Sequence, residues 1–458
     1  MTIAGRACHA DLKPKGFPYM PRTSKRERKS GGASGYTRRQ FLRLAGAAPL
    51  ALTHVGHAGA AAAPGIRPAA FDATHDSVLI WLKGEEAITA RVDYGIDGDT
   101  TQLNRGPSAT LTRDTDYCAT IPLTQLAQGK SWTYRIVDAQ SGTPLSEACR
   151  FKTAPTNPEP FVFAFSADMN ESYQPFKLFD VIDEKGPDFF MHLGDTVYAD
   201  VPVKEPFSPT VSHYRSKHAT NRRDPHLQTC LARHVTYAIW DDHETEDNCN
   251  GHNPYMERAL QVFKEYWPCK TVDPSALYRQ FNWSGIDLFI LDTRRFRSQQ
   301  TLPDGPDKTM LGANQKSWLK ERLKASRAPF KFIITSVPFH GGGVDSWGPY
   351  PSERNELTRF IRAEKITGII FLTGDYHLAR DWSNPKSGLK EFMAGPIASV
   401  THYKYRPDAR ARYEKAGTFH YGDGYNFGLW GVDPAAGKAK LEFIGAGGES
   451  LFQTELTA

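Results

Sequence analysis

The sequence predicts an α/β protein with a smaller all-β domain in front of it. Short β-rich runs bounded by Gly and Asp fill residues 66–155, and this pattern is typical of a β-sandwich. From residue 160 to residue 458, apolar runs of strand length alternate with helical stretches such as 314–323. Such alternation favours a mixed β-sheet of the metallophosphatase type of architecture, with helices on both faces. Of the 458 residues, 40% are hydrophobic, which is enough for a sizeable core and excludes disorder over most of the chain.

Residues 1–60 are predicted to be an export signal and not part of the fold. Arg38 and Arg39 precede Phe41-Leu42 and a short, mildly apolar run over residues 44–52, which together make a twin-arginine signal. Ala58 and Ala60 suggest a processing site, with the mature chain beginning near Ala61. We therefore expect the twin-arginine export machinery as a partner and a periplasmic or secreted location. The apolar run is too short to predict a membrane span, and the alternative is a basic loop beside a short core helix.

The positive charge of the chain belongs to this signal. The whole chain has 56 Lys and Arg against 51 Asp and Glu, but residues 1–60 contain 11 of the basic residues and 2 of the acidic ones. The remainder is therefore slightly acidic, and no nucleic-acid-binding face is expected. The cysteines form no CxxC pair, which argues against a thiolate zinc site. Cys118 with Cys149, and Cys249 with Cys269, are plausible disulfides in an oxidising compartment, although the sequence leaves their connectivity open.

The predicted sandwich domain over residues 66–155 shows no catalytic pattern. Residues 77–82 and 87–94 are short β-rich runs. The spacing of Leu, Gly, Tyr and Val over residues 123–137 resembles that of a fibronectin type III or immunoglobulin-like sandwich. We interpret it as an accessory domain. Runs at 426–432 and 439–444 are expected to be closing strands of the second domain, which spans 160–458.

Acidic and histidine side chains follow the apolar runs of this second domain. Asp168 follows 161–165, Asp195 follows 189–193, residues 241–244 follow 236–240, His340 follows 331–339, and Asp375 and His377 follow 369–373. In open α/β sheets the loops at the carboxyl ends of the strands form the binding crevice. The sequence therefore predicts that five strands bring Asp and His to one edge of a sheet.

Carboxylates gathered in this way need a countercharge. Asp168, Asp195, Asp242 and Asp375 could not all stay ionised together without one. Carboxylate, imidazole and phenolate ligands suit hard or borderline metal ions. With five or more possible ligands, two metal ions that share a bridging carboxylate are the economical interpretation. Such pairs catalyse hydrolytic phosphoryl transfer, because one ion lowers the pKa of a bound water and both stabilise the transition state.

Five short motifs in order point to a known family. They are Gly194-Asp195-Thr196-Val197-Tyr198, Trp240-Asp241-Asp242-His243-Glu244, Leu291-Asp292-Thr293-Arg294, Leu311-Gly312-Ala313-Asn314-Gln315 followed by Trp318-Leu319, and Leu372-Thr373-Gly374-Asp375-Tyr376-His377. Residues 214–228 match as well. On these motifs the chain resembles the alkaline phosphatase D (PhoD-like) family of metallophosphatases over nearly all of its mature sequence.

The resemblance implies an exported phosphatase that hydrolyses small phosphate esters, monoesters or diesters, through a metal-bound hydroxide. It implies that Asp195 bridges two metal positions and that Tyr198 is a phenolate ligand of a ferric ion. Asp242, Asp375 and His377 stand at further ligand positions of the wider superfamily. Asp168 stands where the family often has Cys, and a carboxylate is a competent hard ligand. The implied metals are Fe3+ and Ca2+, with other divalent ions as alternatives.

Four further residues have open roles. His243 is a candidate general acid for the leaving group, with a ligand or orienting role as the alternative. His340, in a glycine-rich segment, and Asn248 are candidate metal ligands. Arg294 suits phosphate oxygens through its guanidinium fork, or else forms a structural pair with Asp292. Asp241 is a candidate for a residue that orients the metal ligands without binding a metal ion itself.

Two other functions compete with the phosphatase hypothesis. The first is a phosphodiesterase or phospholipase-type activity with little monoesterase turnover, since both activities use the same metal core. The second is a non-catalytic, exported surface-binding protein on the same scaffold. The presence of every motif ligand argues against this second hypothesis. The oligomeric state is not predicted.

Overall fold

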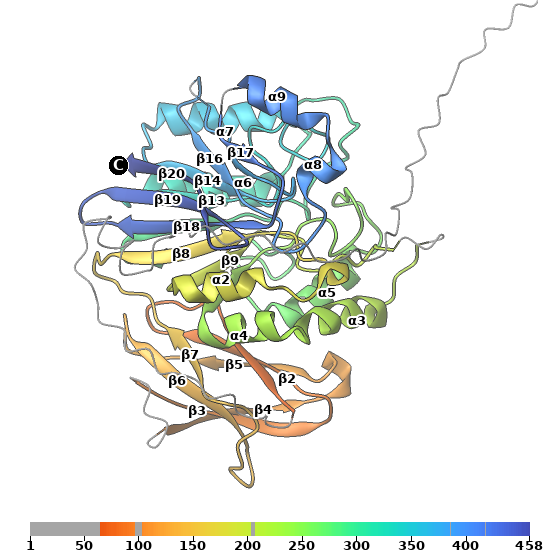
Figure 1. Cartoon of the computed structure of the whole chain (residues 1–458), viewed down its shortest axis with the longest axis vertical. Coiled ribbons are helices and arrows are strands. Elements are labelled where there is room, and N and C mark those ends of the chain that lie inside the picture. The colour runs from red at the N-terminus through yellow and green to blue at the C-terminus, as the bar shows by residue number, and fades with distance from the viewer. Residues whose placement is uncertain (1–64, 97–102, 203–206, 385, 417) are drawn as a thin grey trace, which may run out of the picture. The chain divides into compact units, whose positions relative to one another are not determined.

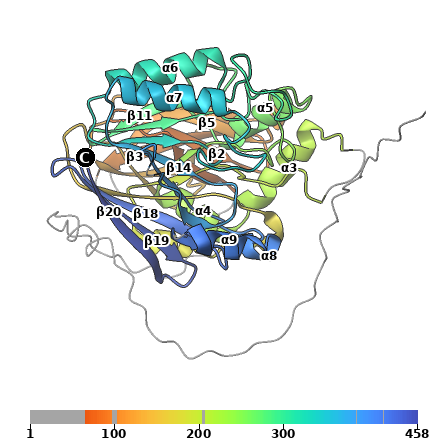
Figure 2. The same cartoon turned by 90° about the horizontal axis from the view of Figure 1, so that it is seen from above.

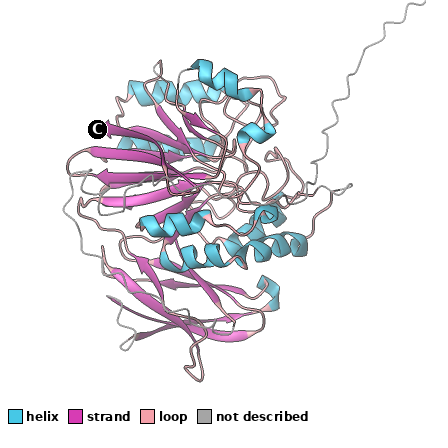
Figure 3. Cartoon of the chain, viewed as in Figure 1, coloured by secondary structure: helices cyan, strands magenta, loops and turns pink. Residues whose placement is uncertain are grey.

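Three β-sheets and their covering helices make up the part of the chain that the computed structural model describes (Figure 1). The described residues are 65–96, 103–202, 207–384, 386–416 and 418–458. The predicted export signal and the processing site near Ala61 lie outside them. Figure 3 shows strands and helices interspersed over residues beyond 160, as an α/β protein requires.

The first sheet has nine strands in the order β20-β19-β18-β8-β9-β10-β1-β2-β5. Strands β8, β9 and β10 are parallel neighbours at its centre. Its strands are β1 (Arg67–Phe71), β2 (Val78–Lys83), β5 (Cys118–Leu123), β8 (Phe161–Ser166), β9 (Phe189–His192), β10 (Val235–Ala238), β18 (Asn426–Asp433), β19 (Lys438–Gly445) and β20 (Ser450–Thr457). The central strands are buried along their whole length, which explains why they are apolar runs and do not alternate with polar residues.

The second sheet has seven strands in the order β11-β12-β13-β14-β16-β15-β17. Its strands are β11 (Arg279–Trp283), β12 (Ile286–Ile290), β13 (Lys331–Ile334), β14 (Ile369–Thr373), β15 (Ala379–Asp381), β16 (Lys390–Met393) and β17 (His420–Tyr421). Strands β12, β13, β14 and β16 run parallel to one another. The two closing strands expected at 426–432 and 439–444 are β18 and β19, and they belong to the first sheet.

The third sheet lies in the N-terminal β-rich segment and has the order β4-β3-β6-β7. Its strands are β3 (Ile88–Ile96), β4 (Asn104–Leu111), β6 (Ser131–Asp138) and β7 (Cys149–Lys152). The other strands of this segment, β1, β2 and β5, extend the first sheet, because Phe71 of β1 pairs in parallel with Thr236 of β10. The segment is thus hydrogen-bonded to the larger body through the first sheet. The division into domains at 66–155 and 160–458 stays a prediction.

Helices cover the two large sheets. They are α2 (Leu178–Lys185), α3 (Val211–Arg222), α4 (Pro225–Arg233), α5 (Met256–Tyr266), α6 (Gly312–Ala325), α7 (Pro351–Ala363), α8 (His402–Tyr405) and α9 (Ala409–Ala416). Helices α6 and α7 lie side by side beyond the seven-stranded sheet (Figure 2). Leu319 of α6 and Leu357 of α7 join a buried cluster with Ile333 and Phe371 of that sheet. The helical stretch expected at 314–323 lies within α6.

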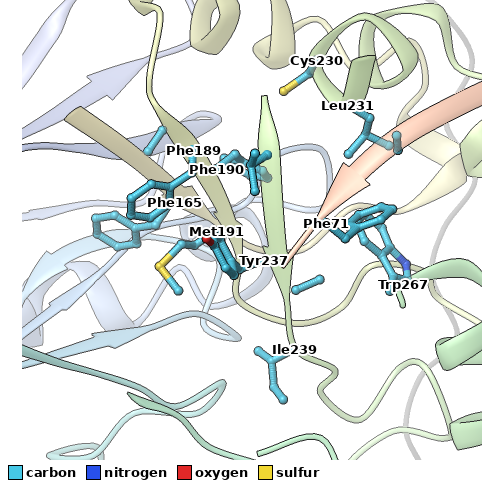
Figure 4. Packing of buried hydrophobic residues seen from close by; sticks show 14 of the residues in the cluster. Phe71, Phe165, Phe189, Phe190, Met191, Cys230, Leu231, Tyr237, Ile239 and Trp267 are labelled. Atoms are coloured by element: carbon cyan, nitrogen blue, oxygen red, sulfur yellow. The ribbon is translucent and has the colours of Figure 1, made fainter. Parts of the chain in front are cut away.

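The two large sheets pack face to face through aromatic side chains. The ring centroids of Phe163 on β8 and Phe332 on β13 are 5.2 Å apart, and Phe332 also contacts Trp430 of β18 at 5.3 Å. Figure 4 shows Phe165, Phe189 and Tyr237 gathered around the central strands of the first sheet. The expectation that five strands of one sheet carry the site was therefore wrong. Strands β8, β9 and β10 belong to one sheet and β13 and β14 to the other, so the site lies where two packed sheets meet.

Two further expectations concern cysteines and membrane spans. Cys118, Cys149, Cys230, Cys249 and Cys269 are free thiols, so the two suggested disulfides do not form in this structure. Among the described residues, we find no helix with the length and apolar character needed to cross a bilayer.

Candidate metal centre

Three of the strands end in turns that hold an aspartate in the left-handed backbone region. The φ angles are 65° for Asp168 after β8, 54° for Asp195 after β9 and 71° for Asp375 after β14. Asp tolerates this region better than most residues, and such conformations cluster at functional sites. His377 shares it, with φ of 55°.

These turns bring ligand-type side chains from both sheets together. Three groups have donor atoms within 4.8 Å of one another, namely Asp168 with Asp195 and His377, Asp195 with Asp242 and His243, and Asp241 with Asp242 and Asp375. Asp195 belongs to the first two groups and Asp242 to the last two. The groups therefore form one continuous cluster, with Asp195 where a bridging ligand is expected.

Glycines allow the backbones to approach this closely. A Cβ atom on Gly395, after β16, would lie 2.4 Å from Oδ2 of Asp168. A Cβ atom on Gly194 would lie 2.6 Å from the Cβ of Asp241, and Gly194 has φ of 113°. Any larger residue at either position would displace a member of the cluster.

The carboxylates are buried and incompletely paired. Asp168, Asp195, Asp241 and Asp242 are at most 2% exposed. Among the described residues, no hydrogen-bond partner reaches either oxygen of Asp168, Oδ2 of Asp195, Asp241 and Asp375, or Oδ1 of Asp242. Buried polar atoms are normally satisfied, so this many orphaned oxygens in one place require an explanation.

Burial and mutual repulsion change the acidity of the cluster. Burial, and then the charge of Asp241, raise the pKa of Asp168 well above its ordinary value. Burial raises the pKa of Asp195 and of Asp375 in the same way. Burial also acts on Asp242, but Arg294 and His243 outweigh it, so the pKa of Asp242 is lowered. Without a cation, most of the cluster would have to take up protons.

His377 is oriented to offer a nitrogen to the cluster. Its Nδ1 lies 2.5 Å from the carbonyl oxygen of Val400 and donates to it, since a carbonyl can only accept. The lone pair of Nε2 therefore faces Tyr198 Oη at 2.9 Å and Asp168 Oδ1 at 3.7 Å. Burial lowers the pKa of His377 to about 4, which keeps the ring neutral as a metal ligand must be. Tyr198 thus joins the cluster from the segment after β9 as an oxygen donor.

His243 is held by a carboxylate that sequence reasoning missed. Its Nδ1 lies 2.8 Å from Oδ1 of Asp200, and its ring stacks on Tyr198 with centroids 4.1 Å apart. Burial by itself lowers the pKa of His243, but Asp200, Asp195 and Asp242 outweigh it and raise the pKa well above its ordinary value. Asp200 follows Tyr198 by two residues, and only its position in the motif region could have drawn attention to it.

Glu244, the last residue of the Trp-Asp-Asp-His-Glu motif, connects two turns. Its Oε1 accepts hydrogen bonds from the N–H of Thr196 at 2.6 Å and from the hydroxyl of Thr196 at 2.7 Å. Its Oε2 accepts from the N–H of Asp241 at 2.9 Å. The turn after β9 is thereby fixed to the turn after β10, which sets the spacing of Asp195 and Asp242.

Arg294 lies behind the cluster and not in front of it. Its side chain is fully buried, and its Nε donates to Asp241 Oδ1 at 2.6 Å while Nη2 donates to Asp345 Oδ2 at 2.9 Å. This placement gives no support to the expected substrate contact, which stays a prediction. It agrees with a structural role, but with Asp241 and Asp345 as side-chain partners, because Asp292 meets only the backbone N–H of Arg294.

Two other predicted ligands are placed differently from the cluster. His340 lies in none of the three groups, and its Nδ1 is 2.7 Å from Oε2 of the buried Glu391. Asn248 donates its backbone N–H to Asp242 Oδ2 at 2.5 Å, and its own carbonyl accepts from Gln300. Asn248 therefore supports Asp242 through the backbone.

The donor set fits hard or borderline cations. Carboxylate, phenolate and imidazole donors converge here, and among the described residues no cysteine belongs to the three groups. Asp168, Asp195, Asp242, Asp375, His377 and Tyr198 can hold metal ions, with His243 at the rim.

Comparisons with known proteins agree with this geometry. Residues 161–443, more than half of the chain, match the model of the PhoD-like phosphatase family. Alkaline phosphatase D of Bacillus subtilis (strain 168) is 25% identical over 369 residues, which are 67% of this chain and 63% of that protein. The match thus spans less than two thirds of the relative's length. Human tartrate-resistant acid phosphatase type 5 is 24% identical over 289 residues, covering 59% of this chain and 79% of that protein.

Solved structures show the same fold. The structure of PhoD superposes with a TM-score of 0.73 at 21% identity and covers 88% of this chain and 90% of that one. The purple acid phosphatase PPD1 from yellow lupin (Lupinus luteus) seeds superposes with a TM-score of 0.62 at 14% identity, over 86% of this chain and 74% of that one.

Proposed function

Because this chain belongs to the PhoD-like phosphatase family, we propose that it is a metal-dependent enzyme that hydrolyses phosphate esters. The observation that carries the proposal is the set of orphaned, buried carboxylate oxygens at the meeting point of the two sheets. A cation pair satisfies these oxygens and replaces the protons that the raised pKa values otherwise demand.

Asp195 is proposed to bridge two metal positions. Asp168, Tyr198 and His377 hold one side of the cluster, and Asp242 with Asp375 holds the other. Bound metal ions supply Lewis acidity, which lowers the pKa of a water molecule and stabilises the charge on the transferring phosphoryl group. The enzyme's own contribution is to keep these donors close, buried and correctly oriented.

His243 is proposed to be the general acid that protonates the leaving oxygen. Its Nδ1 lies 2.8 Å from Asp200 Oδ1, and a ring nitrogen lies within 4.8 Å of donor atoms of Asp195 and Asp242. The Asp200 carboxylate favours the imidazolium form, which has a proton to give. Asp200 is not a member of the three groups, so this effect persists when cations neutralise Asp195 and Asp242.

Replacing Asp200 with Asn is expected to move the alkaline limb of the pH–rate profile to lower pH. A nearby carboxylate raises the pKa of His243, so the loss of that carboxylate lowers this pKa. The protonated acid is then lost at a lower pH. The measurement is kcat/KM for an aryl phosphate between pH 6 and pH 11, together with metal content.

The matched control for Asp200→Asn is Asp183→Asn. Asp183 Oδ1 contacts His234 Nε2 at 2.9 Å in a similar pair away from the cluster, and its loss should leave the profile unchanged. An unshifted alkaline limb in Asp200→Asn would contradict the acid role. A loss of metal with an unshifted limb would instead make His243 a ligand.

Iron beside Tyr198 and calcium in the other position are the proposed metals. Elemental analysis should find both, and a phenolate-to-iron absorption band should colour the protein. Tyr198→Phe removes the donor and should abolish the band and most of the activity. Tyr214→Phe is the control, because that phenol donates to the carbonyl of Thr245 and lies outside the cluster, so the band should remain. A colourless protein, or a band that survives Tyr198→Phe, would contradict the assignment.

Phosphate monoesters are the proposed substrates, and a diesterase or phospholipase-type activity is the competing one. Turnover on an aryl phosphate and on a bis-aryl phosphate, each with and without a chelator, compares them directly. Chelator-sensitive turnover on either substrate supports the proposed chemistry. Tight metal binding without ester hydrolysis would instead favour a surface-binding protein.

The enzyme is proposed to act in the periplasm or outside the cell after twin-arginine export. The signal that motivates this proposal lies outside the described residues, so its support is the sequence motif. Cell fractionation of the wild type and of an Arg38→Lys, Arg39→Lys variant tests it, since retention of only the variant in the cytoplasm is expected.

A further inference from the structure

A pocket of about 350 Å³ has no role in the proposed reaction. Gly341 and Gly342 line it from the loop after β13, and Arg380, Trp382 and Ser383 line it from β15 and the residues that follow. A pocket of this size is sufficient for a small organic group.

Arg380 is the charged group that distinguishes this pocket. Its guanidinium stacks over the rings of Trp382 at 4.5 Å and Tyr413 at 3.9 Å, and the residue is only 8% exposed. Among the described residues it forms no ion pair with a carboxylate, and its buried Nε has no hydrogen-bond partner. By contrast, the buried guanidinium groups of Arg294 and Arg297 each contact Asp345.

Among the described residues, no carboxylate around the pocket forms an ion pair with Arg380, although Tyr413 and the more distant charge of Glu391 act on it. Asp381 lines the pocket and its Oδ1 accepts the N–H of Ser383 at 2.8 Å, but its carboxylate is not within ion-pair distance of Arg380. Glu391 is engaged by His340 at 2.7 Å. The hydroxyl of Ser383 is buried without a hydrogen-bond partner among the described residues, so it is available as a second donor.

The neighbouring helices add positive charge. Residues 402–416, which include α8 and α9, contain five Lys and Arg against two Asp and Glu. Burial, and then the charges of Arg406, Arg380 and Arg412, lower the pKa of His402 to about 4. The surroundings of Arg380 therefore favour an anion.

The pocket lies next to the reacting part of the site. Tyr376 directly follows Asp375, and its ring contacts that of Trp382 with centroids 5.6 Å apart. On its other side, a Cβ atom added to Gly343 would lie 2.1 Å from the Tyr376 hydroxyl. Tyr376 thus connects the turn that carries Asp375 to the pocket wall.

We propose that this pocket binds an anionic group, a carboxylate or a phosphate, carried by the alcohol portion of the ester substrate. Arg380 contributes a planar fork that matches either oxyanion, Ser383 contributes a hydroxyl donor, and Trp382 contributes an apolar face. The inference rests on the proposed phosphatase function and narrows its substrates to esters with a second negative charge.

Three substrates of matched size test the proposal on the full enzyme. They are 4-carboxyphenyl phosphate, 4-phosphonophenyl phosphate and the neutral 4-carbamoylphenyl phosphate. We expect kcat/KM for at least one anionic substrate to exceed that for the neutral one by about tenfold or more, as a charge-assisted hydrogen bond provides. The better anionic substrate identifies the group that the pocket prefers. Equal values, or a preference for the neutral substrate, would overturn the proposal.

Variants of the pocket residues show which side chains cause the preference for an anionic substrate. Arg380→Gln should reduce the ratio of the anionic to the neutral kcat/KM to near one, and Ser383→Ala should reduce it partly. Arg412→Gln removes the same charge from an exposed neighbour and should reduce the ratio far less than Arg380→Gln does. A ratio that survives Arg380→Gln, or that falls equally in Arg412→Gln, would contradict a direct contact. If Arg380→Gln does not fold, Ser383→Ala and Arg380→Lys carry the same test.

A binding measurement separates this proposal from the enzymatic one. Titration calorimetry with 4-carboxybenzylphosphonate and 4-carbamoylbenzylphosphonate needs no turnover. If no ester is hydrolysed, the proposed function fails, while a tenfold tighter Kd for the carboxylated probe still supports the pocket. If esters are hydrolysed and the two Kd values agree, only the pocket assignment fails.

Discussion

Asp195→Asn is expected to lower the turnover of an aryl phosphate by at least about 10²-fold and to reduce the metal content of the purified protein. Asp195 belongs to two of the three groups, so under the proposed assignment its carboxylate would serve both metal positions. An amide keeps the shape of the side chain but supplies no charge. Steady-state kinetics and elemental analysis of the same preparation give both quantities.

The same variant should remain folded. Burial raises the pKa of Asp195 well above its value in an unfolded chain. The metal-free native state therefore binds more protons than the unfolded state, and it loses stability as the pH rises above the unfolded pKa. Asn removes that loss, so metal-free Asp195→Asn should melt at the same temperature as the metal-free wild type or higher at neutral pH.

Asp72→Asn is the matched control for Asp195→Asn. Asp72 is also buried, but it forms an ion pair with Arg279, with Oδ2 2.7 Å from Nε. Its replacement should lower thermal stability while the folded fraction keeps its metal and its turnover. Near-normal turnover with full metal content in Asp195→Asn would refute the bridging assignment.

Arg294→Gln is expected to destabilise the protein by about 3–5 kcal/mol, because it leaves buried carboxylates without their cation. Its fully buried guanidinium contacts Asp241 at 2.6 Å and Asp345 at 2.9 Å, and it lies 3.6 Å from Asp242. Urea unfolding of metal-loaded and metal-free protein measures the change. The larger loss of stability should occur without metal. Bound metal ions compensate part of the negative charge that Arg294 no longer neutralises.

The neighbouring residue provides the control for Arg294→Gln. Arg295 pairs with Glu257, whose side chain is 72% exposed, and such surface pairs contribute less than about 1 kcal/mol. Arg295→Gln should therefore unfold almost as the wild type does. A raised KM at wild-type stability in Arg294→Gln would restore the substrate contact that the sequence predicted and would contradict the structural assignment.

The ligand positions could be predicted because their signals are local. An apolar run of strand length ending in Gly-Asp, as at Asp195 and Asp375, encodes both the buried strand and the turn that follows it. The motifs also fix the order of these turns along the chain. Those two facts sufficed for the α/β class and for the PhoD-like family, and they pointed to Asp and His side chains that the structure brings into one cluster.

The partners of these ligands could not be predicted from such signals. Asp200 and His243 are 43 residues apart, and Arg294 and Asp345 are 51 residues apart. No periodicity relates positions at these separations. Arg294 follows a strand, as the candidate ligands do, yet its long side chain contacts the buried carboxylates of Asp241 and Asp345.

The sequence by itself determined which residue types stand at the strand ends, and therefore the metal chemistry that they permit. Only the tertiary structure decided that these ends come from two sheets, that Arg294 is buried behind them, and that Arg380 faces a pocket without a carboxylate partner. The physical reason is that strands and the turns after them depend on residues that are close together in the sequence. The pairing of charges depends on which distant surfaces pack together and exclude water.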